Sequence, residues 1–300
     1  MPVADSSDSL VTEPEVVSVP GLKVMTSPIV RRRRLSAELR RWRVRAGMTL
    51  SDAAEELDWS PAKLGHIETG IRKKLSIPEV SALLQLYGVT GGQREAILTL
   101  AREARTRPWW SDYENVVSSA YVGNEAGAVA IDTYGGALIP DLLQAPEYTA
   151  LLARSRGYNG RLTDRMVAAY LNRQENLDRD TLTRYHALVE EDALQRVTDP
   201  ETRHAQLSRM IELAEEHERV TIQLLSSSLG PHAGFAGPFT VLGFDEGESS
   251  LVFVDNPHGG TIVEAEADVA SYQEVWHDLV GMAADRQDTV TVLRRLDLLT

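Results

Sequence analysis

Lys63 and His66, in the first third of this 300-residue chain, carry side chains that can form hydrogen bonds with the edges of DNA bases. They are one helical turn apart, so on a helix both would project from the same face. Pro61 and Ala62 lie just before them and could contact only thymine methyl groups or sugar edges. Thr69 follows one turn later. Together these residues predict a helix face that reads the major groove.

A basic tripeptide, Arg72-Lys73-Lys74, follows this candidate helix. Its cationic groups suit contacts with phosphate oxygens, which position a protein on a duplex without reading its sequence. The alternative interpretation of Lys63 and His66 is that they are ordinary exposed polar residues.

Charge is divided unevenly along the chain. The formal net charge is −13, which would argue against a nucleic-acid partner if the charge were uniform. Residues 31–107, however, contain 16 Lys and Arg against 9 Asp and Glu, whereas residues 108–300 contain 14 against 31. Only the first block can comfortably face a phosphate backbone, because neutralising phosphates requires Lys and Arg at the contact surface.

A basic helix is predicted over residues 31–45, where Leu35, Leu39 and Trp42 fall at helical spacing. Eight arginines occupy this stretch with a single acidic residue, so we expect a face directed at phosphates. The alternative is a solvated basic face. Gly47 is expected to end the helix.

Two shorter helices are predicted next. Thr49 is a good N-cap for the first, and Ser60 with Pro61 at the first helical position is a strong start signal for the second. Asp58 falls in the turn between them, where a left-handed residue is expected and Asp is tolerated. Two helices joined by so tight a turn predict a helix-turn-helix within residues 33–75.

Residues 59–70, WSPAKLGHIETG, resemble the recognition helix and closing turn of the Cro/CI-type (XRE-type) repressors. The resemblance implies an all-α, lambda-repressor-like domain that binds double-stranded DNA. Many members carry Gln at the start of the second helix, where this chain has Leu50. We expect Glu68 to pair with an arginine of the first helix, Arg40 or Arg41 among the candidates.

The remaining chain predicts an α+β domain. The expected division is a disordered tail at 1–30, the helix-turn-helix domain at 31–107, a linker at 108–122 and the α+β domain at 123–300. The adjacent Trp109 and Trp110 are expected to dock the linker onto a neighbouring core. Helices are predicted over 125–134, 146–156, 162–177, 201–217, 267–284 and 289–299, and strands over 185–189, 220–225, 239–244, 251–254 and 261–263.

Short sequence segments in the predicted α+β domain resemble one group of XRE-type regulators. The C-terminal domain of that group has no known function, is found chiefly in actinobacteria and is often called antitoxin-like. The segments are IPDLLQAPEY at 139–148, NRQ at 172–174, VEEDAL at 189–194, QL at 206–207 and GPF at 237–239. Asp141 and Ala145 replace a glycine and a threonine of the pattern. The resemblance implies a small protein partner encoded by a neighbouring gene.

Composition and motifs weigh against other classes of protein. The chain has no cysteine, and no apolar run approaches the ~18 residues that span a bilayer, so we expect a cytoplasmic protein without a membrane partner. The histidines lack metal-helix spacing, and Glu190 and Glu191 at a strand end would point to opposite faces. We therefore expect neither a cofactor nor catalysis. The leading hypothesis is a homodimeric DNA-binding regulator with a small protein partner. The alternative is a small-molecule sensor that uses residues 231–244 as a pocket wall.

Overall fold

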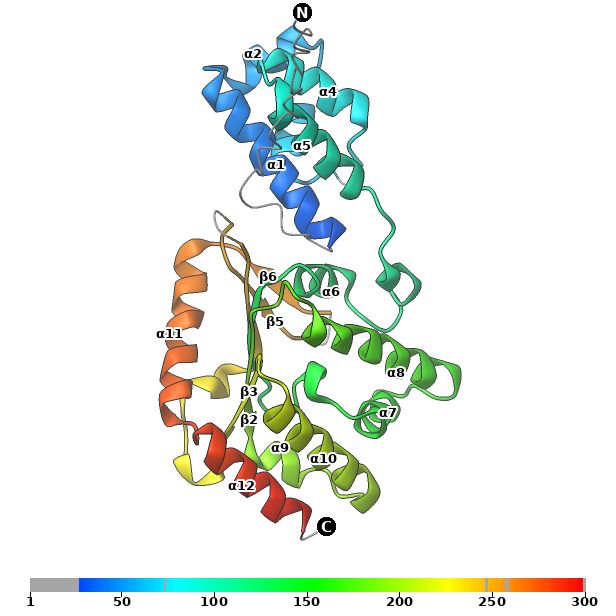
Figure 1. Ribbon diagram of the computed structural model, residues 1–300, viewed down its shortest axis with the longest axis vertical. Helices are drawn as coiled ribbons and strands as arrows, with labels where there is room; N and C mark the ends of the chain where they lie inside the picture. The colour runs from blue at the N-terminus through cyan, green and yellow to red at the C-terminus, as the bar shows by residue number, and fades with distance from the viewer. Residues whose placement is uncertain (1–26, 73, 246–247, 257–258, 299–300) are drawn as a thin grey trace, which may run out of the picture.

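The computed structural model describes residues 27–72, 74–245, 248–256 and 259–298. A helical N-terminal domain lies at one end of the molecule, and a larger domain built around a sheet lies at the other (Figure 1). The predicted class, an all-α domain followed by an α+β domain, is confirmed. Most of the predicted tail, residues 1–26, lies outside the described residues.

Five helices surround one core in the N-terminal domain. They are α1 Pro28–Arg45, α2 Leu50–Glu56, α3 Pro61–Glu68, α4 Ile77–Leu86 and α5 Gly91–Glu103. Leu39, Leu64 and Leu83 are fully buried where α1, α3 and α4 meet. Burial of these side chains against each other, rather than helix propensity, is the main force that holds such short helices in place.

The capping signals behave as the sequence predicts. The hydroxyl of Thr49 accepts a hydrogen bond from the Asp52 amide, and the Asp52 carboxylate accepts one from the Thr49 amide. Ser60 caps α3, and Asp58 adopts φ 53° in the turn between α2 and α3. The helix-turn-helix is therefore set by local chemistry at both helix starts.

The start of α1 differs from the prediction, which placed residues up to 30 in a tail. Ser27 caps α1 by accepting hydrogen bonds from the amides of Ile29 and Val30, and Pro28 occupies the first turn. Val30 is fully buried. The physical reason is the Ser-Pro start signal at residues 27 and 28, which begins the helix about one turn before the arginine run.

The C-terminal domain contains a six-stranded mixed sheet with helices on both faces. Its strands are β1 Ala130–Tyr134, β2 Arg184–Glu190, β3 Val220–Leu225, β4 Phe239–Gly243, β5 Leu251–Val254 and β6 Thr261–Val263. Its α-helices are α6 Ser119–Glu125, α7 Pro146–Ser155, α8 Arg161–Gln174, α9 Glu191–Gln195, α10 Pro200–Glu216, α11 Glu266–Met282 and α12 Arg286–Asp297. Short 3₁₀ turns are η1 Trp109–Asp112, η2 Asp141–Leu143, η3 Glu175–Asp178, η4 Ser227–Leu229 and η5 Ala233–Ala236.

The strand order is β3-β2-β1-β4-β5-β6, with β1, β2 and β3 parallel and the other three strands joined antiparallel. α11 covers one face of the sheet, and α10 and α12 pack together on the other (Figure 1). Along β2, Tyr185 and Ala187 belong to the α10 side and Leu188 to the α11 side. This alternation is the period of two expected for a strand buried on both faces.

Two sequence predictions at the start of this domain are wrong in part. Residues 125–134 were expected to be helical, but the chain leaves α6 at Glu125 and forms the central strand β1. Periodicity does not separate a helix from a strand in a short apolar run, and burial on both faces of the sheet decided it. The expected linker 108–122 includes η1 and the first turn of α6. Its tryptophans do dock, with Trp110 buried against Val122.

α1 also contacts the C-terminal domain. The hydroxyl of Ser27 donates to the carbonyl of Gly123. Gly123 and Gly127 lie against the side chains of Ile29 and Val30, so closely that a Cβ at either glycine would overlap its neighbour. The first turn of α1 is thus fitted to α6 through Gly123 and to the turn after α6 through Gly127.

Arg33 adds polar contacts between the domains. Its guanidinium donates to Asn124 Oδ1 at 3.2 Å and to Glu248 Oε2 at 2.9 Å, and it lies 4.1 Å from the centre of the Phe244 ring. One residue of the arginine run therefore joins the two domains.

Gly127→Ala should destabilise the chain by about 1–3 kcal/mol, because the new methyl group would overlap the stiff Val30 side chain. Gly281→Ala is the matched control, since that helical glycine has open space around its missing Cβ and alanine favours helix. Urea unfolding of both variants measures the difference. Equal stability of the two variants would contradict this description of the junction.

Candidate nucleic-acid interface

α3 offers one face to solvent because its other face is buried. Leu64 and Ile67 pack into the domain core. Four of the predicted contact residues are exposed on this helix and its C-cap: Pro61, Ala62, His66 and Thr69. The Thr69 hydroxyl donates to the Gly65 carbonyl at 2.8 Å, which fixes its orientation.

Lys63 is half-buried and its ammonium group has two partners. Its Nζ lies 3.5 Å from the centre of the Trp59 ring and 3.2 Å from Glu79 Oε1. The Arg72 Nη2 donates to the same Glu79 oxygen at 2.7 Å. The fold thus brings together Lys63 of α3 and Arg72 of the following loop. Lys74 of that loop is exposed, and Lys73 lies outside the described residues.

Glu79 is not among the predicted site residues, although the sequence contains a signal for it. Ser76 and Glu79 form a capping box at the start of α4, with the Ser76 amide donating to Glu79 Oε2 at 3.0 Å and the Ser76 hydroxyl donating to it at 2.8 Å. Ser-x-x-Glu before an apolar helix predicts this box. The Ser-x-x-Glu pattern does not reveal that the other oxygen, Glu79 Oε1, binds both Lys63 and Arg72.

The carboxylate of Glu79 is held in its charged form. Partial burial by itself would raise its pKa, but hydrogen bonds from Ser76 and Lys63 and the charge of Arg72 outweigh it, so the pKa lies below its ordinary value. Hydrogen bonds from Thr49 likewise lower the pKa of Asp52.

Glu68 pairs with Arg43 rather than with Arg40 or Arg41, which corrects the sequence prediction. Arg43 Nε donates to Glu68 Oε1 at 2.7 Å and Nη2 donates to Oε2 at 2.8 Å. Both residues are buried, and the hydrogen bond to Glu68 raises the pKa of Arg43. The reason is geometric: Arg43 continues the inward-facing row of Leu35 and Leu39 at intervals of four residues.

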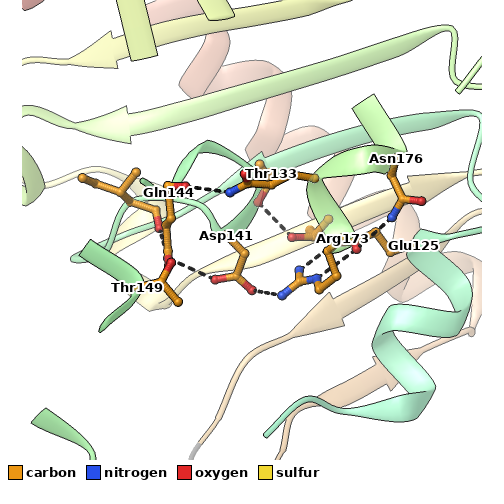
Figure 2. A network of polar contacts seen from close by, with 10 residues as sticks. Glu125, Thr133, Asp141, Gln144, Thr149, Arg173 and Asn176 are labelled. Carbon is orange, nitrogen blue, oxygen red and sulfur yellow. Dashed lines mark hydrogen bonds and ion pairs between the residues drawn. The ribbon is translucent and has the colours of Figure 1, made fainter. Parts of the chain in front are cut away.

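Two of the C-terminal motifs, 139–148 and 172–174, meet in a buried polar network (Figure 2). Arg173 donates to both oxygens of Glu125, at 3.0 and 2.7 Å, and to Asp141 Oδ2 at 2.8 Å. Arg173 and Glu125 are almost completely buried, and Asn176 donates to Glu125 at 3.3 Å. The network connects α6, η2 and α8, so we interpret it as a structural clamp.

Amide side chains extend this clamp. Gln206 of α10 accepts from the Ala145 amide at 2.8 Å and donates to the Leu143 carbonyl at 2.8 Å. Gln174 donates to the Gln144 carbonyl at 2.6 Å. These contacts hold the segment 139–148 against α8 and α10. The buried side-chain amides of Gln174 and Gln206 thus satisfy backbone groups of this loop that have lost contact with water.

The segment 231–244, expected as a pocket wall, forms η5 and β4. His232 Nε2 lies 3.2 Å from Glu190 Oε1, which also accepts from the Tyr134 hydroxyl at 2.8 Å. Glu191 instead accepts from Ser226 at 3.3 Å, so the two adjacent carboxylates do point to different surroundings. A hollow of about 330 Å³ lies elsewhere, between η3 and α10. It is lined by Gln174, Leu177, Asp178, Arg209, Glu212, Leu213, Glu216 and His217.

Across the part of the chain that the structure describes, no group of three or more His, Asp or Glu side chains could hold a metal ion. No described helix is long and apolar enough to cross a membrane.

Two known families match separate parts of the chain. A helix-turn-helix domain family matches residues 34–97, so the protein is a helix-turn-helix regulator that binds DNA. The family described as a domain of unknown function, DUF5753, matches residues 118–295, more than half of the chain. The chain therefore belongs to the DUF5753 family. Searches of curated proteins and of solved structures give no significant match.

Arg43→Ala should destabilise the chain by about 3–5 kcal/mol, because it leaves the buried Glu68 carboxylate without its partner. Arg41→Ala is the control: Arg41 pairs with Glu38 on the surface, where such a pair contributes at most about 1 kcal/mol. Chemical denaturation followed by circular dichroism compares them. A smaller loss for Arg43→Ala than for Arg41→Ala would exclude the buried clamp.

Stability of the helix-turn-helix should fall in acid. The folded-state pKa values of Asp52 and Glu79 lie below their ordinary values of 3.8 and 4.5. Each carboxylate therefore stabilises the folded domain above its unfolded-state pKa, and this stabilisation is lost as the pH falls through the folded-state pKa. Hydrogen–deuterium exchange in α2 and α4 at decreasing pH, corrected for intrinsic exchange, measures the loss. Asp52→Asn should weaken the pH dependence in α2, whereas Glu56→Gln, on the same helix but outside the capping box, should leave it unchanged.

Proposed function

We propose that the protein is an XRE-type, sequence-specific transcriptional regulator that places α3 in the major groove. One observation carries this proposal: the exposed face of α3, with His66, lies next to a pair of cations, Lys63 and Arg72, at the edge of the same domain. Lys63 and His66 of α3 would read base edges, and Arg72 would meet phosphates. Lys74 extends the phosphate-facing surface.

Binding as a homodimer fits this proposal. One helix-turn-helix contacts a short half-site, and two copies one helical turn apart give the contact area that tight binding requires. A two-fold operator would follow from the two-fold symmetry of the protein.

For the C-terminal domain we propose a role in binding rather than catalysis. The block 108–300 has 31 Asp and Glu against 14 Lys and Arg, which favours a basic partner. The antitoxin-like resemblance suggests a small protein encoded by a neighbouring gene. A small-molecule effector is the second candidate; the hollow of about 330 Å³, which is lined mostly by charged and polar side chains, would suit a polar effector rather than an apolar one. The whole protein would act in the cytoplasm.

Alanine substitutions on the two parts of the interface should have different effects. Lys63→Ala and His66→Ala should each reduce the preference for a selected operator over random DNA by about 1–3 kcal/mol. Lys74→Ala should weaken binding to all DNA and reduce the salt slope by about 1. Arg72→Ala should also weaken binding to all DNA.

The operator would be selected from a library of random duplexes, and titrations at several salt concentrations would measure each variant. Arg295→Ala, an exposed arginine on α12, is the control and should bind DNA as the wild type does. Equal losses on operator and random DNA in Lys63→Ala, His66→Ala and Lys74→Ala would contradict the assignment of α3 as the reading helix.

Co-expression with the neighbouring gene product tests the partner proposal. A complex that survives gel filtration at physiological salt and dissociates at high salt is expected, because the proposed contact is electrostatic. A chain that elutes alone would contradict it. A thermal shift with a metabolite library would then test the effector alternative.

A further inference from the structure

A single carboxylate holds both cations at the edge of the reading face. Glu79 Oε1 lies 3.2 Å from Lys63 Nζ and 2.7 Å from Arg72 Nη2. Lys63 comes from α3 and Arg72 from the loop after it, so neither pair is a local contact along one helix. The side chains of Lys63 and Arg72 are 29% and 34% exposed, so both remain accessible to DNA.

Glu79 itself has little freedom to move. Its second oxygen, Oε2, accepts from the amide and the hydroxyl of Ser76 at the start of α4. The Trp59 ring covers the Lys63 ammonium from another side, at 3.5 Å from the ring centre. Lys63 and Arg72 are therefore held at fixed positions before any DNA arrives, which reduces the side-chain entropy lost on binding.

The same carboxylate also opposes DNA binding. A phosphate that approaches Lys63 or Arg72 meets the negative charge of Glu79 at the same place, and both cations must share their charge between the two. A fixed Lys63 favours a duplex whose base edges match its position, and a fixed Arg72 favours a duplex of matching backbone shape, whereas a lowered local charge weakens binding to every duplex.

From this geometry we infer that Glu79 is a positioning residue of the DNA interface, which orients Lys63 and Arg72 and raises discrimination between operator and random DNA at the cost of affinity. The inference rests on the proposed function, because it requires that α3 faces DNA. It assigns to the α4 capping box a role in specificity besides its role in helix initiation.

Glu79→Gln separates the two roles. The glutamine carbonyl oxygen can still accept the hydrogen bonds from Ser76, so the cap is retained, while the negative charge is lost. Thermal unfolding verifies that the variant is folded. Glu103→Gln is the matched control, because Glu103 also pairs with an arginine, Arg31, at 3.3 Å in the same domain but on α5.

In titrations with the full chain, Glu79→Gln should bind random DNA about three- to tenfold more tightly and with a steeper salt slope than the wild type. The ratio of operator to random affinity should fall by a similar factor. Glu103→Gln should change neither quantity. Glu79→Asp, which keeps the charge, should restore part of the discrimination.

A double-mutant cycle tests whether Glu79 changes DNA discrimination through Lys63. In a Lys63→Ala background, Glu79→Gln should change discrimination much less than in the wild type, because one of the two cations that it orients is gone. An unchanged random-DNA affinity in Glu79→Gln, or an equal weakening on both DNAs, would overturn the inference while leaving the DNA-binding proposal intact. A wild-type chain that selects no operator would instead overturn the proposed function.

Discussion

Helix α1 is shared by both domains, and the arrangement of the molecule depends on how it is held at its two ends. At its start, Ser27 and Ile29 are fitted against Gly123 of α6 and Val30 against Gly127 in the turn that follows, where a Cβ atom would prevent the close approach. Towards its end, Leu39 lies in the helix-turn-helix core and Arg43 clamps Glu68 at the end of α3. One continuous helix therefore contacts both the C-terminal domain and α3.

Internal carboxylates determine how much of the basic charge is available to DNA. The sequence concentrates eight arginines between residues 31 and 45, which suggests a phosphate-facing helix. The fold uses Arg31, Arg33 and Arg43 in ion pairs with Glu103, Glu248 and Glu68. Such pairs form because a partly buried guanidinium must recover the hydration that it loses. Arginine count alone therefore overestimates the phosphate-binding capacity of α1.

The C-terminal domain also pairs an arginine with carboxylates, and this pair is more completely buried. Arg173 is almost completely buried and donates hydrogen bonds to Glu125 and Asp141, while Asn176 donates to Glu125. Because Glu125 is the last residue of α6, this clamp also fixes the helix against which α1 packs. Three of the segments that carry the family resemblance, 139–148, 172–174 and 206–207, are thus held together by polar contacts in the domain interior. The network therefore contacts α6, which in turn packs against α1 of the helix-turn-helix domain.

The sequence alone determined the features that depend on local chemistry. Thr49, Ser60 and Asp58 set the helix starts and the turn, because capping and left-handed backbone conformations are decided by one to four neighbouring residues. The exposed face of α3 followed from its burial pattern, and most strands followed from β-branched runs between turns. The tertiary structure decided the rest. It made a strand of residues 130–134, which lie at the centre of the sheet, because burial on both faces outweighed a helical pattern. It also chose Arg43 as the partner of Glu68 and placed Glu79 between Lys63 and Arg72, since which charges meet depends on how α1, α3 and α4 pack.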